Sequence, residues 1–203
     1  QDTRNVKAGL VGLEAAFEAA GERLPVAVSA TIETTGTMLG GQDAEALAAS
    51  LLHADLLYLG MNCATGPEPM RPYIKQICEG FPGPVIVQPN AGMPENRDGE
   101  MVYTLPIETF SETLADFVKQ YGVNIVGGCC GTHPGYIDAL SKTVEGLQPR
   151  PRQVQPAPAL ASLFSAQTLD QEPRPFYVGE RSNTNGSKAF RERLLEEDWD
   201  GIV

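Results

Sequence analysis

Three of the four cysteines stand where they could act together. Cys129 and Cys130 are adjacent within the stretch NIVGGCCGTHPG, and Cys63 ends the short apolar run DLLYLGMNC. Disulfide geometry disfavours a bridge within a vicinal pair, so the pair needs another partner. Three protein ligands with one open position are typical of catalytic zinc, and soft thiolates select zinc over magnesium or calcium. The pattern predicts a zinc site, and the alternative is that these are small buried cysteines.

The residues around the vicinal pair fit a site at a tight turn. Gly127 and Gly128 lack side chains where the backbone must bend closely, and Gly131 permits a positive φ just after the pair. His133 is followed by a proline, which is typical of the first turn of a helix. We therefore expect His133 outside the zinc shell. Cys78 lies on an apolar face of a predicted helix, and we expect it to be buried and to pack in the core.

Alternating helices and strands must position these residues. Apolar residues spaced three and four apart predict a helix over 5–20. We interpret 24–32 as a strand buried on both faces and 94–105 as a polar loop. The further predicted strands are 55–63, 83–92 and 123–130, and the further predicted helices are 43–54, 68–78, 107–121 and 134–146. This alternation indicates an α/β fold with parallel strands.

The polar and reactive residues follow the carboxyl ends of successive predicted strands. Asn62 and Cys63 follow one strand, Asn90 the next, and the vicinal cysteines the last. Functional groups at this rim suit a (β/α)8 barrel of the TIM-barrel type, which typically has about 250 residues. Four βα units make half of such a barrel.

Composition changes along the chain predict its domains. Residues 147–175 hold six of the 16 prolines and read as a linker. We expect half of a barrel in 1–146 and the first βα unit of a second, truncated domain in 176–203. Since half a barrel would expose two sheet edges, we also expect dimerisation or aggregation through them.

The negative charge of the chain disfavours two classes of partner. Lys and Arg number 15 against 26 Asp and Glu, a formal charge of −11. This disfavours nucleic acid and anionic membranes as partners. The sequence has no run of 18 apolar residues and no signal-peptide pattern at its start, so we expect a cytoplasmic protein without a membrane partner.

Four motifs in order give a family resemblance. GMNCATGPEPM, VQPNAGMP and VNIVGGCCGTHPGYIDAL resemble motifs of the homocysteine S-methyltransferase family. The tail VGERSNTNGSKAFRERL resembles the start of a pterin-binding domain, an order similar to that of the cobalamin-dependent members. The resemblance implies that Cys63, Cys129 and Cys130 bind zinc. It also implies that the chain holds about the last four βα units of the barrel.

The same resemblance implies a reaction and its cofactors. Homocysteine bound at zinc would take a methyl group from methylcobalamin to give methionine, and methyltetrahydrofolate would supply that methyl group to cobalamin. The cobalamin-binding domain would lie outside this chain. The expected residues include Asn90, Thr31 and Glu33 for homocysteine, with loop capping as the alternative for Asn90, and Glu180 and Asn183 for folate.

Two other functions remain open at the level of the sequence. One is a homocysteine methyltransferase that uses a different methyl donor, which the pterin-type tail argues against. The other is a non-catalytic module that zinc stabilises, which would have a closed site with four protein ligands.

Overall fold

The computed structural model describes residues 2–175 and 182–202. The chain forms two compact units, Gln1–Leu169 and Asp170–Val203, and each is described by itself. No helix among the described residues is both long and apolar enough to cross a membrane.

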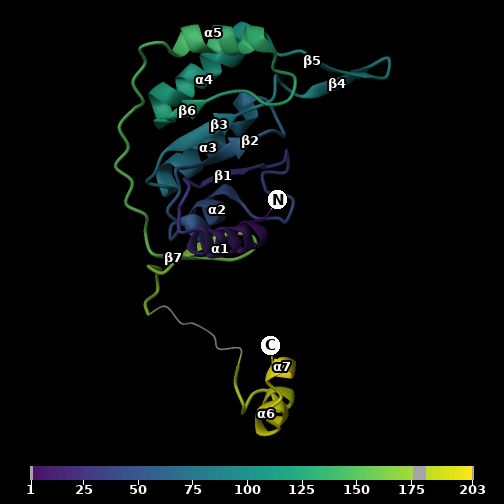
Figure 1. The fold of residues 1–203 in the computed structure, drawn as a ribbon, viewed down its shortest axis with the longest axis vertical. Helices are drawn as coiled ribbons and strands as arrows, with labels where there is room; N and C mark the ends of the chain where they lie inside the picture. The colour runs from purple at the N-terminus through teal and green to yellow at the C-terminus, as the bar shows by residue number, and fades with distance from the viewer. Residues whose placement is uncertain (1, 176–181, 203) are drawn as a thin grey trace. The chain divides into compact units, whose positions relative to one another are not determined.

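A four-stranded parallel sheet forms the centre of the first unit. Its order is β1-β2-β3-β6, so each strand lies beside the next one along the chain in this set (Figure 1). The strands are β1 (Ala27–Ala30), β2 (Tyr58–Asn62), β3 (Val85–Gln88) and β6 (Ile125–Val126). The helices are α1 (Thr3–Ala20), α2 (Ala44–Leu51), α3 (Pro67–Gly80), α4 (Ile107–Tyr121) and α5 (Pro134–Val144). The predicted parallel α/β alternation is confirmed.

Local signals explain where these helices begin and end. The side chains of Asp2 and Asp43 accept hydrogen bonds from the first turns of α1 and α2. Proline stands in the first turn of α3 and of α5. Gly122 ends α4 in the left-handed conformation, with its N–H bonded to the carbonyl of Phe117.

Strand β1 is buried on one face only, which corrects the interpretation of 24–32 as a strand buried on both faces. In β1, Val28 and Ala30 are buried whereas Ala27 and Ser29 are exposed. The buried face continues in β2 and β3 and packs against apolar residues of α3 and α4, among them Met70, Ile74, Ile77, Phe110, Leu114 and Phe117. Among the described residues, helices cover this face alone. In β2 and β3, however, three successive residues are buried, 59–61 and 85–87, so the alternation of β1 does not extend to these central strands.

Residues 94–105 contain a β-hairpin and are not simply a polar loop. The strands β4 (Pro94–Arg97) and β5 (Glu100–Tyr103) pair antiparallel, and Figure 1 shows the hairpin projecting from the first unit. Asp98 and Gly99 form its two-residue turn, and both have positive φ. An Asp-Gly pair is a strong hairpin signal because it adopts this turn readily. The hairpin lacks the apolar alternation on which strand prediction relies.

The proline-rich segment is ordered against the first unit as far as Leu169. A second hairpin, β7 (Ala159–Ala161) with β8 (Ala166–Thr168), lies near α2. Its loop accepts hydrogen bonds from Asp43 N–H, at the carbonyl of Phe164, and from the side chain of Gln42, at the carbonyl of Ser162.

The second unit contains two described helices, α6 (Lys188–Leu195) and α7 (Trp199–Ile202). Ser187 caps α6, its hydroxyl accepting a hydrogen bond from Phe190 N–H. The strand predicted at the start of this segment falls mainly on 176–181, which lie outside the described residues.

Candidate metal centre

The three predicted zinc ligands meet at the carboxyl edge of the sheet. Cys63 directly follows β2, and Cys129 and Cys130 follow β6, while β3 lies between these two strands. The end of β3 and the residue after it join them: Cys63 N–H donates to the carbonyl of Gln88 at 3.1 Å, and Cys129 N–H donates to that of Pro89 at 2.9 Å. Residues far apart in sequence thus share one scaffold.

The sulfur atoms lie within contact of one another. The Sγ–Sγ distances are 2.9 Å from Cys63 to Cys129, 3.5 Å from Cys63 to Cys130 and 3.9 Å from Cys129 to Cys130. Zinc–sulfur bonds of about 2.3 Å in a tetrahedron place two sulfurs about 3.8 Å apart. Two of the three distances therefore fit zinc as they stand, and the Cys63–Cys129 pair would need to separate slightly. We call these three residues the thiol cluster.

Hydrogen bonds between the thiols shift the pKa values of Cys63 and Cys129. Hydrogen bonds from Cys129 and Cys130 lower the pKa of Cys63, with burial opposing them. Burial, together with the proton that Cys129 donates toward Cys63, raises the pKa of Cys129 to about 11. Thiolate charges this close repel one another, and a bound cation would compensate them. This donor set fits a soft divalent metal ion.

Unusual backbone conformations aim the sulfurs at one point. Cys63 and Ala64 both have positive φ, 64° and 54°, which costs of order 1–3 kcal/mol each for residues with a side chain. Gly128 is tightly enclosed, since a Cβ there would lie 2.5 Å from the hydroxyl oxygen of Thr132. The sequence-based reading of tight backbone at the vicinal pair is confirmed at this glycine and at Gly131, which has a φ of 78°.

Asn90 is buried beneath the vicinal pair. Its side-chain oxygen accepts a hydrogen bond from Cys130 N–H at 3.1 Å, and Ala91 N–H donates to the Cys130 carbonyl at 2.9 Å. Asn90 therefore holds the Cys130 backbone, which corresponds to the loop-capping alternative. A contact between Asn90 and homocysteine remains a prediction.

The other predicted homocysteine-binding residues lie in the loop after β1. Thr31 and Glu33 are both half-buried, and the backbone of Glu33 closes a turn with Thr37. Among the described residues, the group able to hold a metal contains the three cysteines and not Glu33. The roles of Thr31 and Glu33 in binding homocysteine remain predictions.

The predicted folate-binding residues belong to the second unit. The side-chain oxygen of Asn183 accepts hydrogen bonds from the N–H groups of Asn185 and Gly186. Glu180 lies outside the described residues. Their role in folate binding remains a prediction.

Two residues near the motifs have other roles in the structure. His133 caps α5, with its Nδ1 accepting from Gly135 N–H at 3.1 Å, as its position before Pro134 predicts. Cys78 is buried in α3, and burial raises the pKa of its thiol to about 12. Neither belongs to the thiol cluster.

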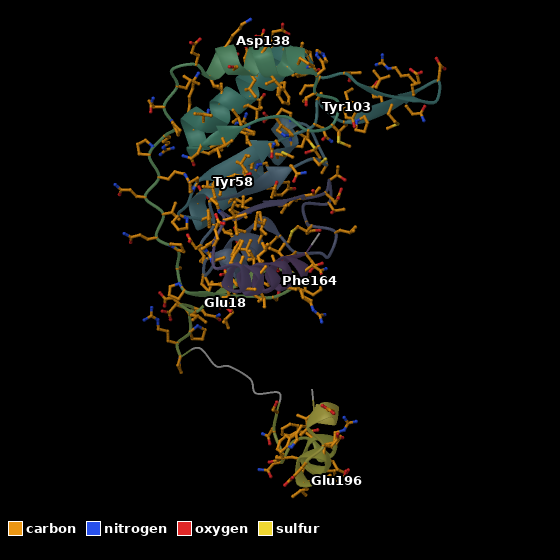
Figure 2. The ribbon with its side chains drawn as sticks, viewed as in Figure 1. Glu18, Tyr58, Tyr103, Asp138, Phe164 and Glu196 are labelled. Carbon is orange, nitrogen blue, oxygen red and sulfur yellow. The ribbon has the colours of Figure 1, made fainter. Side chains whose placement is uncertain are left out.

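Sequence reasoning missed Tyr103, at the end of β5. Figure 2 shows this residue at the base of the projecting hairpin. Desolvation raises its pKa, followed by the charge of Cys130 and a hydrogen bond with that side chain. The Asp98–Gly99 turn was the available signal, because a hairpin there would bring β5 back toward the vicinal pair.

Comparisons with known proteins identify several that are similar to this chain. Methionine synthases of Mycobacterium leprae and Mycobacterium tuberculosis are 39% and 37% identical to the chain over 98% of its length. The chain spans 17% of the length of each of these relatives. The solved apo structure of the homocysteine methyltransferase MmuM from Escherichia coli is 25% identical, with a TM-score of 0.45, over 64% of this chain and 45% of that one.

A family model provides the assignment, because it matches most of the first unit. The model is that of homocysteine S-methyltransferase, and it matches residues 1–144, which include all three residues of the thiol cluster. The chain belongs to the homocysteine S-methyltransferase family.

Proposed function

We propose that this chain supplies the homocysteine-activating site of a methionine synthase, with Cys63, Cys129 and Cys130 as zinc ligands. The observation that carries the proposal is the meeting of three sulfurs within 3.9 Å at the carboxyl edge of the sheet. Family membership and the two mycobacterial relatives support it. We further propose that the sheet is part of a (β/α)8 barrel, specifically about its last four βα units, because its second face is left without helices among the described residues.

The chemistry follows from the acidity of thiols. Free homocysteine has a thiol pKa of about 8.5, so only a few per cent is the nucleophilic thiolate at neutral pH. When bound, zinc keeps a ligand thiol deprotonated. The thiol cluster supplies three of four tetrahedral ligands, and the exposure of Cys130 leaves a solvent-facing side for the substrate. The substrate sulfur would attack the methyl carbon of the donor, forming the S–C bond of methionine as the donor's bond to that carbon breaks.

The proposed methyl donor is methylcobalamin, held by a part of the enzyme outside this chain and remethylated by methyltetrahydrofolate. The similarity to methionine synthases extends over 98% of the chain and so includes most of the second unit. This favours methylcobalamin over other donors. Within the chain, Glu180 and Asn183 are the residues proposed to contact folate.

Homocysteine binding to the zinc-loaded chain tests the proposal. Calorimetry in two buffers of different ionisation enthalpy should show binding with release of the thiol proton. The metal-free chain and homoserine, which has oxygen in place of sulfur, are the matched controls, and neither should reproduce this signal. A chain that binds zinc but not homocysteine would instead have a structural zinc site.

A further inference from the structure

The side chain of Tyr103 packs directly on the turn that carries the vicinal cysteines. Gly131 has a φ of 78°, and a Cβ built there would lie 2.2 Å from Cγ of Tyr103. The tyrosine ring therefore occupies the space that a side chain at position 131 would need. This contact fixes Gly131, the residue directly after Cys130, against the end of β5.

Backbone hydrogen bonds hold the exit of the hairpin in register with the same turn. Leu105 N–H donates to the carbonyl of Ala91 at 3.2 Å, and Ala91 N–H donates to the carbonyl of Cys130 at 2.9 Å. The hydroxyl of Tyr136, in α5, also donates to the carbonyl of Leu105. Tyr103 thus lies two residues before Leu105, whose backbone is held by these hydrogen bonds, and at the opposite end of the hairpin from the Asp98–Gly99 turn.

We propose that Tyr103 is a positioning residue of the proposed metal site: its ring seats the Cys130 turn, and its hydroxyl donates a hydrogen bond to Cys130 Sγ. The inference rests on the proposed function, since it concerns a sulfur that binds the metal. Partners that hydrogen-bond to metal ligands orient them and tune the metal. A donor at the sulfur withdraws electron density that would otherwise pass to the ion.

This role gives β4–β5 a function. An ordinary phenol has a pKa of about 10, so Tyr103 is a neutral donor at physiological pH. A hydrogen bond to a thiolate is charge-assisted and stronger than a bond between neutral groups. The hairpin supplies this donor from outside the parallel sheet.

Cobalt substitution measures the electronic effect without any turnover. Co(II) in place of zinc gives sulfur-to-cobalt charge-transfer absorption, whose energy falls as the sulfur becomes a better electron donor. Tyr103→Phe removes only the hydroxyl, so we expect the band to shift to longer wavelength with unchanged cobalt stoichiometry. Tyr136→Phe is the matched control, because it removes a hydroxyl bonded to Leu105 and not to sulfur. We expect no shift in this control.

A second variant tests the contact between the ring and the turn. Gly131→Ala places a methyl group against the Tyr103 ring, which must move away. This variant should show the same shift to longer wavelength as Tyr103→Phe.

The outcomes separate this inference from the proposed function. If the original chain binds cobalt through sulfur and Tyr103→Phe leaves the band in place, Tyr103 has no electronic role and the inference is wrong. An equal shift in Tyr136→Phe would assign the effect to the hairpin connection and would also overturn it. If the original chain shows no sulfur-to-cobalt band, the proposed metal site itself fails.

Discussion

At the scale of single residues, the local backbone places the three sulfurs of the thiol cluster together. Cys63 lies in a strained left-handed conformation, and Asn90 holds the backbone of Cys130 by a hydrogen bond. Sequence reasoning identified the three cysteines because their types and positions after strands are informative. It could not identify the strain at Cys63, because nothing in the residue type announces a positive φ.

Replacing one cysteine tests the ligand set. Cys129→Ser should lose most of its zinc at equilibrium, because serine is a poor zinc ligand beside two thiolates. Zinc per chain after dialysis against a weak chelator measures the effect. Cys78→Ala is the control: it removes a thiol outside the cluster and should keep its zinc, although it loses some stability from the core. Equal zinc in all three proteins would contradict the ligand assignment.

The pKa of Cys129 predicts how zinc affinity depends on pH. Since this pKa is raised to about 11, the thiol carries its proton at neutral pH and must release it when zinc binds. The apparent affinity should therefore rise with pH, by about tenfold per pH unit for each proton displaced. The lowered pKa of Cys63 reduces its own share of this dependence. Competition with a chromophoric chelator at several pH values measures the slope, and a flat profile would contradict the pKa order.

At the scale of elements, the alternation of helices and parallel strands was predictable from the sequence. The pairing of strands in a hairpin outside the parallel sheet was not. The helix predicted over 107–121 matches α4, because its apolar face and its Gly122 end are both local signals. The strand predicted over 123–130 shrinks to Ile125–Val126, although the N–H groups of Gly127 and Cys129 still donate to the carbonyls of Val87 and Pro89. The β4–β5 hairpin was missed because its polar strands pair with each other and not with the core.

Arg152 anchors the proline-rich segment to the end of α3. Its guanidinium donates to the carbonyls of Cys78, Phe81 and Gly83 at the end of α3. Arg152→Ala should lower the free energy of unfolding by about 1.5–3 kcal/mol, the range for hydrogen bonds to a charged group. Urea denaturation measures this loss. Arg150→Ala is the control, because Arg150 is exposed and makes one such bond, and an equal loss in both variants would contradict the anchoring role.

At the scale of the whole molecule, the candidate metal site lies entirely within one unit. All three cysteines and their hydrogen-bonding partners belong to residues 1–169. The sequence predicted a linker over 147–175 between two domains, but it could not show that this segment packs within the first unit as far as Leu169, because those contacts depend on the β7–β8 hairpin.

A shortened chain tests the independence of the first unit. A protein ending at Leu169 should bind zinc with the same stoichiometry and affinity as the full chain, since the second unit supplies no residue to the thiol cluster. Loss of zinc binding from a shortened chain with unchanged helix content by circular dichroism would show that the second unit contributes to the site.

The sheet edges predict self-association. Among the described residues, β1 and β6 each pair on one side only, and Ile125 in β6 is 40% exposed. Unpaired edges are templates for other strands, so light scattering should detect species larger than one chain at high concentration. Arg substituted at Ile125 should reduce their amount, whereas a strictly monomeric original chain would contradict this prediction.

The central claim is that three cysteines hold zinc and leave its fourth position for the sulfur of homocysteine. X-ray absorption at the zinc edge counts sulfur ligands directly. We expect three sulfurs and one light atom in the zinc-loaded chain, and four sulfurs after homocysteine is added. Four protein ligands before homocysteine, or a sulfur count that homocysteine does not change, would contradict the account.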